Sequence, residues 1–303
     1  MVQDEARKGH AESKKVALPA VAVGVLAVSA AAIFIRLAEA PALAVAFWRS
    51  ALGVLVLLPF AFYRQDAFPR GRALWGGIAS GIALGAHFGF WISSLDYTSV
   101  AASVVLVCTQ PVFVAILAYL AFGERTSPLS FLGILVALAG TLVISSGRSV
   151  GSATFFGNGL AVIGAITVAV YVLIGRSLRT TGVGVLPYSI VVYSSTAATL
   201  LPAALYSGAS LWGYSGETWF WLGAITLGPQ ILGHTVFNWA LRYVQASLIS
   251  GTILAEPVVS TFFAWLVLSE RPGLATLLGG AVVLVGLFCL LYGHRAPPAE
   301  PIA

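Results

Sequence analysis

Residues 243–293 read YVQASLISGTILAEPVVSTFFAWLVLSERPGLATLLGGAVVLVGLFCLLYG, and the chain contains a second version of this stretch. The segment 146 positions earlier, residues 97–147, aligns with it without a gap. Identical residues in the two copies include Tyr97 and Tyr243, Pro111 and Pro257, Glu124-Arg125 and Glu270-Arg271, Gly133 and Gly279, Gly140 and Gly286, and Gly147 and Gly293. Shared hydrophobicity alone does not produce ungapped identities at tyrosine, proline and glycine. We therefore interpret the two segments as a duplication.

The composition is typical of a membrane protein. Of the 303 residues, 59% are hydrophobic and 9% are charged, and the mean hydropathy is +0.94. Soluble domains carry about 25% charged residues, so we expect this chain to lie in a lipid bilayer. The net charge of +5 then belongs to loops that face lipid head groups and cytoplasm, and no nucleic-acid partner is expected. The two cysteines, Cys108 and Cys289, lie in apolar runs and indicate neither a disulfide nor a metal site.

Ten apolar segments approach the length of about 20 residues that a membrane-spanning helix needs. They cover residues 16–37, 43–63, 73–95, 99–121, 129–146, 155–176, 185–207, 217–240, 246–268 and 274–293. Lys and Arg are concentrated in alternate connections, which places both termini in the cytoplasm. The sequence predicts an all-α integral membrane fold of ten transmembrane helices, with cytoplasmic tails at residues 1–15 and 294–303.

Each copy of the repeat holds five of these spans, residues 16–149 in the first copy and residues 150–293 in the second. Because five is an odd number, the second copy enters the membrane in the opposite orientation. Inverted repeats are an architecture of secondary transporters, which bind their substrate near the midplane at the repeat interface. The sequence thus predicts two inverted five-helix repeats around a central cavity, and a transporter that works by alternating access.

Polar side chains at bilayer depth are rare and are candidates for function. In the third span, His87 and Trp91 share one face and are candidates for lining the cavity. A histidine that is bonded to a neighbouring carbonyl is the alternative interpretation. Another face of this span carries a glycine at every fourth position, a pattern that lets a second helix pack closely. These glycines are Gly77, Gly81, Gly85 and Gly89.

The eighth span repeats this pattern. Gln230, His234 and Asn238 follow one another at intervals of four residues and share one stripe of a helix. His234 and its counterpart in the third span would face one central space, and Tyr171 of the sixth span is a further candidate for its lining. No Cys, Asp or Glu accompanies the histidines at ligand spacing, so neither a metal site nor a cofactor is expected.

The ninth span carries Glu256 directly before Pro257, where the proline frees the carbonyl of Ile253 from its helical hydrogen bond. The carboxylate could bind a substrate amine, carry a proton or pair with a cation. It could also be a structural residue at a kink. Its counterpart Gln110, before Pro111, does not titrate, so any proton role would differ between the two halves.

Arg49 lies within the second span, directly after Phe47-Trp48. Arginine keeps its charge, so at this depth it needs a carboxylate, carbonyl groups or an anionic ligand. A structural or gating role is favoured over a contact with a substrate carboxylate.

The chain resembles the drug/metabolite transporter superfamily, specifically its EamA-type members with ten helices in two repeats. The resemblance covers residues 16–293. It rests on AFWRSAL at residues 46–52, YTSVAA at residues 97–102, Gln110-Pro111, Glu256-Pro257 and LSERP at residues 268–272. The chain is most similar to the YddG-type exporters, which implies a central hydrophobic cavity and export of aromatic and other neutral amino acids. The resemblance implies no obligatory coupling ion.

The expected function is export of a small metabolite across the bacterial inner membrane by a monomer that lies in the lipid bilayer. A lipophilic-cation exporter of the same superfamily is the second candidate, because aromatic rings and Glu256 would both bind a cation. An enzyme is not expected, since the chain has no HExxH motif, no paired intramembrane aspartates and no Ser/His pair at a helix start. A channel is disfavoured because the sequence has no filter-like loop.

Overall fold

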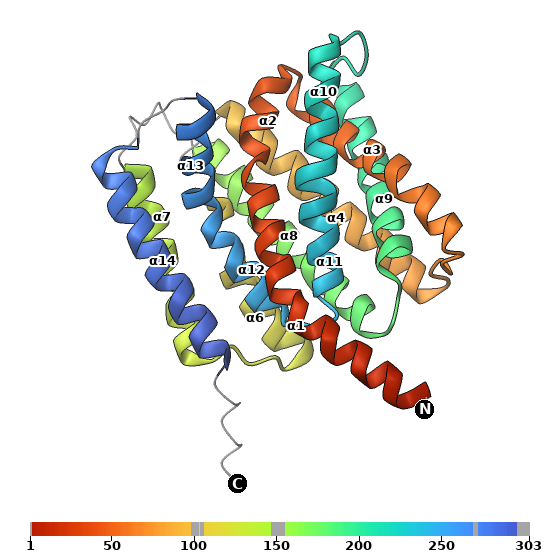
Figure 1. Ribbon diagram of the computed structural model, residues 1–303. Helices are drawn as coiled ribbons and strands as arrows, with labels where there is room; N and C mark the ends of the chain where they lie inside the picture. Colours follow the sequence, from red (N-terminus) through yellow and green to blue (C-terminus); the bar gives the residue numbers. More distant parts are fainter. Residues whose placement is uncertain (1, 98–102, 104–105, 147–154, 269–271, 296–303) are drawn as a thin grey trace.

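The computed structural model is all-helical and describes residues 2–97, 103, 106–146, 155–268 and 272–295 (Figure 1). Several predicted features lie outside these residues. They are residues 98–102 of the YTSVAA segment, the repeat boundary between residues 149 and 150, Gly147, the Glu270-Arg271 turn and most of the C-terminal tail.

The first half of the chain contains six described helices. They are α1 (Val2–Ser29), α2 (Ala31–Ala38), α3 (Ala42–Tyr63), α4 (Arg72–Tyr97), α6 (Gln110–Phe122) and α7 (Pro128–Ser146). The second half contains α8 (Phe155–Thr180), α9 (Val185–Tyr206), α10 (Gly216–Ile225), the π-helix η1 (Thr226–Thr235), α11 (Val236–Ala240), α12 (Ala246–Thr252), the 3-10 turn η2 (Ile253–Ala255), α13 (Glu256–Leu268) and α14 (Leu274–Arg295). The helix α1 begins at Val2, so residues 2–15 of the predicted tail are helical.

Seven helical segments of the described chain are long and apolar enough to cross a membrane. They are Lys15–Ala38, Ala42–Tyr63, Arg72–Ser94, Phe155–Thr180, Val185–Tyr206, Ala246–Val267 and Leu274–His294. The other three predicted spans correspond to the shorter helices α6 and α7 and to the continuous run α10–η1–α11, whose π-helical part contains Pro229.

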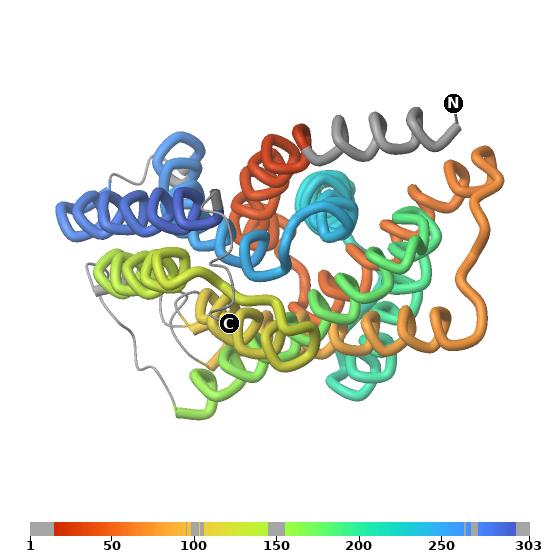
Figure 2. Tube along the Cα trace, turned by 90° about the horizontal axis from the view of Figure 1, so that it is seen from below, coloured from red at the N-terminus to blue at the C-terminus, as the bar shows by residue number. Residues whose placement is uncertain are grey.

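The most extensive packing between described elements joins the two copies of the repeat, through α7 and α14, which lie side by side at one edge of the molecule (Figures 1 and 2). A Cβ atom added at Gly133 would lie 2.6 Å from the carbonyl oxygen of Gly286, and one at Gly140 would lie 2.7 Å from that of Gly279. The order of the contacts reverses along the helices, so α7 and α14 run antiparallel. Each glycine of α7 packs against the sequence counterpart of the other one.

A second glycine contact brings α4 close to α9. A Cβ atom at Gly81 would overlap the carbonyl oxygen of Val192, while one at Gly85 would lie 3.0 Å from the Cβ of Thr199. Gly77 and Gly89 face the same helix, and a Cβ atom at Gly89 would meet only Leu200, at 3.6 Å. The glycine face of α4 is thus a packing face, and it leaves another face of the helix free to point toward the interior.

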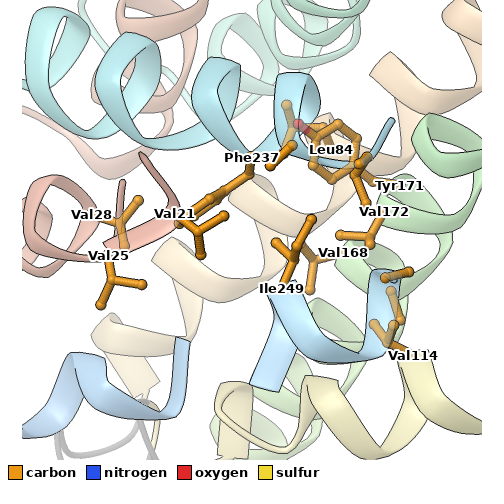
Figure 3. Close-up of a cluster of buried hydrophobic side chains, with 14 of the residues drawn as sticks. Val21, Val25, Val28, Leu84, Val114, Val168, Tyr171, Val172, Phe237 and Ile249 are labelled. Carbon is orange, nitrogen blue, oxygen red and sulfur yellow. The ribbon is translucent and has the colours of Figure 1, made fainter. Parts of the chain in front are cut away.

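The interior is built by helices from both halves of the chain (Figure 3). Val21 of α1 lies beside Phe237 of α11, and Val168 of α8 lies near Ile249 of α12. These side chains are buried, whereas the outer faces of the helices expose large apolar side chains such as Leu120 and Phe288. An apolar exterior of this kind fits contact with lipid.

Candidate substrate cavity

A cavity lies between the two halves of the chain and receives side chains from both. It contains about 810 Å³ of empty space, counted together with the part that opens to solvent. The polar and aromatic residues that line it are Arg49, His87, Phe88, Trp91, Cys108, Gln110, Tyr171, His234, Phe237, Asn238, Ser250 and Glu256.

Seven of the eight residues predicted for the cavity line it. They are His87, Trp91, Gln110, Tyr171, His234, Asn238 and Glu256. The eighth, Gln230, is completely buried and lies behind Arg49 instead. Pro111 and Pro257 follow the lining residues Gln110 and Glu256 in the first turns of α6 and α13.

Arg49 points into this cavity from α3. Its side chain is 1% exposed, and its Nε donates a 2.7 Å hydrogen bond to Oε1 of Gln230. The guanidinium carbon lies 4.1 Å from the centre of the Phe88 ring, which is a favourable cation–π distance. Among the described residues, Nη1 of Arg49 has no hydrogen-bond partner although it is buried. The structural partner expected from the sequence is therefore an amide and a ring, and neither neutralises the charge.

The π-helix η1 determines where Gln230 lies. Pro229 stands within η1, and π-helical turns are often found at functional sites. Tyr193 of α9 donates a 3.1 Å hydrogen bond to the backbone carbonyl of Gln230, and its hydroxyl is 2.8 Å from Oγ1 of Thr235. These bonds hold the backbone of Gln230, so its side chain approaches Arg49 from a fixed position.

The two predicted histidines both reach the cavity. Nδ1 of His87 donates a 2.9 Å hydrogen bond to the carbonyl of Gly164, and its ring is stacked on Trp91 with the centroids 5.8 Å apart. The alternative of a carbonyl-bonded histidine is thus observed, and the same residue still lines the cavity. His234 lies edge-on to Phe88, with the ring centroids 5.4 Å apart. Within the described residues, no group of three or more His, Cys, Asp or Glu side chains could hold a metal ion.

Tyr171 and Asn238 form a buried pair on the second-half side of the cavity. The Tyr171 hydroxyl donates a 2.7 Å hydrogen bond to Oδ1 of Asn238. The backbone carbonyl of Asn238 accepts a 2.9 Å bond from Nε of Arg179. The Tyr171 hydroxyl and the side chain and backbone carbonyl of Asn238 therefore all have hydrogen-bond partners within the protein.

Glu256 and its sequence counterpart Gln110 occupy equivalent places in the two halves. Each is the first residue of a helix, α13 and α6, and each lines the cavity. The carbonyl of Ile253, expected to be freed by Pro257, accepts the backbone N–H of Glu256 through the 3-10 turn η2.

The two opposite charges in the cavity do not pair with each other. In the part of the chain that the structure describes, ion pairs join Arg64 to Asp66 and Arg176 to Glu124, and none joins Arg49 to Glu256. The two charges nevertheless interact electrostatically. The cavity therefore presents a guanidinium and a separate carboxyl group.

Three further polar atoms of the lining have no partner among the described residues. They are Nε1 of Trp91, Oε1 of Gln110 and Oγ of Ser250, all of them buried. Buried polar atoms in proteins are usually hydrogen-bonded, so these atoms are available to water or to a ligand in the cavity. Ser250 and Cys108 were not predicted for the lining, because nothing in their immediate sequence distinguishes them from ordinary helix residues.

An ion pair joins the two halves of the chain beside Leu241, a residue of the cavity lining. Nε of Arg176 in α8 donates a 2.8 Å hydrogen bond to Oε1 of Glu124, which lies between α6 and α7. Nη1 of the same arginine donates to the carbonyl of Leu241, a residue of the lining. The contact thus ties the first half of the chain to the second.

Comparison with protein families identifies one match that covers most of the chain. The model of the EamA-like transporter family matches residues 15–146 and again residues 155–292. The two matches correspond to the two halves that the sequence repeat defines.

Several curated proteins and solved structures are similar to this chain. An uncharacterized transporter of Archaeoglobus fulgidus is 26% identical over 256 residues, which are 80% of this chain and 85% of the relative. The pseudopaline exporter CntI of Pseudomonas aeruginosa is 25% identical over 258 residues, 84% of this chain and 87% of the relative. The uncharacterized inner membrane transporter YedA of Escherichia coli is 25% identical over 255 residues, 83% and 82% of the two chains. One crystal structure superposes with a TM-score of 0.77 at 21% identity, covering 93% of this chain and 98% of that one, which shows a shared fold.

Proposed function

Because this chain belongs to the EamA-like transporter family, we propose that it exports aromatic and other neutral amino acids by alternating access. Membership of the family makes the protein a transporter of small molecules and not an enzyme. It is a multi-pass protein of the inner membrane, as its Escherichia coli relative is named. Export as the direction is supported by the name of the Pseudomonas aeruginosa relative, and the narrower resemblance to YddG-type exporters supports the substrate class.

We further propose that the protein has ten membrane-spanning helices in two inverted repeats and that both termini are cytoplasmic. The antiparallel packing of Gly133 against Gly286 and of Gly140 against Gly279 supports the inversion, because it is the contact that a two-fold axis in the membrane plane would produce. The distribution of Lys and Arg supports the orientation. The protein acts as a monomer in this proposal.

The observation that carries the substrate proposal is the charge pattern of the cavity. One positive group, Arg49, and one negative group, Glu256, face the same space without pairing, and aromatic rings such as Trp91 and Phe88 stand between the polar residues of the lining. A small zwitterion with an apolar side chain offers one partner to each charge and an apolar surface to the rings. A neutral amino acid has this chemistry.

A lipophilic cation remains the second candidate, and the combination of Glu256 with aromatic rings favours it. The buried charge of Arg49 acts against it, because a cation without a carboxylate would meet a like charge in a site of low dielectric constant. The cavity therefore fits the zwitterion better than the cation.

The test is counterflow in proteoliposomes that contain the purified protein. Vesicles are loaded with unlabelled phenylalanine, leucine or the cation tetraphenylphosphonium, and entry of the labelled compound is followed with and without a proton gradient. Saturable counterflow of phenylalanine and leucine supports the proposal. Counterflow of tetraphenylphosphonium alone would move the function to export of lipophilic cations, and non-saturable flux of all compounds would contradict a carrier.

A further inference from the structure

We propose that Arg49 is the anchor for a carboxylate group of the substrate and that Gln230 is the positioning residue that aims the guanidinium into the cavity. The proposal deepens the proposed function, on which it rests for the view that the substrate is a zwitterion. It assigns recognition of the substrate carboxylate to one side chain. That side chain would make the protein bind amino acids more tightly than amines that lack a carboxylate.

The hydrogen bonds of Arg49 leave the outer part of its guanidinium available. Nε is occupied by Gln230, and one face of the group covers the ring of Phe88. Nη1 is buried and has no partner among the described residues, and Arg49 is one of the residues that line the cavity. A guanidinium has a planar fork of N–H donors whose geometry matches the two oxygens of a carboxylate. The part of this fork that faces the cavity is the part that Gln230 does not use.

The protein itself does not neutralise Arg49. Its side chain is 1% exposed, and the acidic side chain that shares the cavity, Glu256, forms no ion pair with it in the described structure. The other ionisable groups around it are His87, His234, Cys108, Tyr171 and Tyr193, and none of them is a carboxylate. A buried charge without a counter-charge in contact with it is costly, and the more distant Glu256 offsets only part of that cost. A carboxylate brought by the substrate would remove that cost when it binds.

Gln230 determines the direction of the guanidinium. Its Oε1 accepts from Nε at 2.7 Å, while its backbone carbonyl is held by the Tyr193 hydroxyl at 3.1 Å. Nε–H and Nη2 share one edge of the guanidinium, so an acceptor fixed at Nε sets the orientation of the plane and leaves Nη1 on the other edge, where it has no partner among the described residues. Because Arg49 lines the cavity and Gln230 does not, we assign Nη1 to the carboxylate of the substrate.

The rest of the lining suits the other parts of an amino acid. Glu256 and Oε1 of Gln110 are acceptors for an ammonium group, and Oε1 is without a partner in the described structure. Trp91 and Phe88 provide rings against which an apolar side chain can lie. The substrate class is therefore an α-amino carboxylate, and loss of the carboxylate should weaken binding more than a change of the side chain.

The experiment compares three probes of similar size on the purified full-length protein: L-phenylalanine, 3-phenylpropanoate, which lacks the amine, and 2-phenylethylamine, which lacks the carboxylate. Binding is measured by isothermal titration calorimetry. The wild type should bind 2-phenylethylamine at least about tenfold more weakly than L-phenylalanine, which is the loss of one charge-assisted contact. Arg49→Lys and Arg49→Gln should lose affinity for both carboxylate probes and should leave the affinity for the amine unchanged or higher.

The variants of Gln230 separate a positioning role from a purely structural one. Gln230→Ala removes the acceptor, so the ratio of phenylalanine to phenylethylamine affinity should fall. Gln230→Glu retains the acceptor but supplies a carboxylate from within the protein, so it should remove most of the affinity for 3-phenylpropanoate while the protein stays folded. A structural role alone would lower thermal stability without moving the ratio. Arg64→Lys, at an exposed arginine that is paired with Asp66, is the matched control and should change neither.

The outcomes distinguish this proposal from the proposed function. If phenylalanine shows counterflow but Arg49→Gln retains the full preference for carboxylates, the anchor is wrong and the function stands. If no amino acid shows counterflow while 3-phenylpropanoate binding depends on Arg49, the anchor stands and the function is wrong. Failure of the wild type to bind either carboxylate probe would overturn the anchor.

Discussion

Nε of Arg49 is bonded to Oε1 of Gln230, 181 positions later in the chain, at 2.7 Å. The bond connects α3 in the first half to the π-helix η1 in the second half, so the charged group of one half is oriented by the other. In a transporter that works by movement of its two halves, such a bond couples the orientation of a binding group to the conformation of the protein. A shift of η1 relative to α3 would change where the guanidinium points.

Replacing Glu256 with glutamine should lower counterflow of phenylalanine about tenfold, because an amide binds an ammonium group more weakly than a carboxylate does. The same change removes a titratable group that lines the cavity, so the dependence of the rate on pH should become flatter. Initial rates at acidic, neutral and alkaline pH measure both effects. Rates equal to the wild type at every pH would show that Glu256 is only structural. Glu217→Gln, at an exposed glutamate, is the control.

Trp91→Ala should weaken phenylalanine binding without preventing folding, since the side chain borders the cavity and its ring nitrogen has no partner in the described structure. Gly81→Ala should instead lower the stability of the protein and affect binding less than Trp91→Ala does, because the added Cβ would overlap the carbonyl oxygen of Val192. An overpacked contact of this kind costs about 1–3 kcal/mol. Calorimetric affinity and thermal stability in detergent separate the two effects. Gly89→Ala, where a Cβ meets only Leu200 at 3.6 Å, should be tolerated on the same helix.

Two neighbouring glycines of α14 allow a test of its packing against α7. Gly279→Ala would place a Cβ atom 2.7 Å from the carbonyl oxygen of Gly140, so we expect a loss of about 1–3 kcal/mol in stability. Gly280→Ala meets only Val258, at 3.8 Å, and should be neutral or slightly stabilising because alanine favours a helix. The comparison needs only thermal unfolding of the two variants. Equal stabilities would mean that α7 and α14 are not in backbone contact.

Breaking the ion pair between Glu124 and Arg176 should favour a conformation in which the cavity is open beside Leu241. Glu124→Gln removes the charge that holds the 2.8 Å contact between the two halves. Cys108 lines the cavity and is a native reporter of access. In a Cys289→Ser background, a water-soluble thiol reagent should modify Cys108 several times faster in Glu124→Gln than without that change.

The control for this measurement is Asp66→Asn, which breaks the exposed ion pair with Arg64. It should leave the labelling rate of Cys108 unchanged. An equal rate in Glu124→Gln and its parent would contradict a closing role for the pair.

Much of the architecture follows from two patterns in the sequence, the repeat and the helical period. The ungapped repeat pairs Gly133 with Gly279 and Gly140 with Gly286, and these four residues form the contact between α7 and α14. The helical period of the third span separates the glycine face from the face of His87 and Trp91, and in the structure the two faces have different neighbours. Patterns of this kind depend on the period of a single helix, which the sequence contains.

The details of the binding site depend on contacts that no local pattern contains. Gln230 was placed on one stripe with His234 and Asn238 on the assumption of a regular α-helix. Between residues 226 and 235 the chain is a π-helix, with bonds from residue i to i+5, so the stripe turns and Gln230 leaves the lining. The sequence does not predict the direction of the guanidinium of Arg49 either, because that direction depends on the hydrogen bond between Nε and Gln230.

The contact between α7 and α14 also bears on how such a chain could arise. Gly133 packs against Gly286, the repeat counterpart of Gly140, and Gly140 packs against Gly279, the counterpart of Gly133. The two halves therefore contribute equivalent surfaces to the contact. A self-complementary surface of this kind is what joins two identical subunits about a two-fold axis. A half-length ancestor could therefore have assembled with an upside-down copy of itself through the same glycines, before gene fusion joined the two copies in one polypeptide.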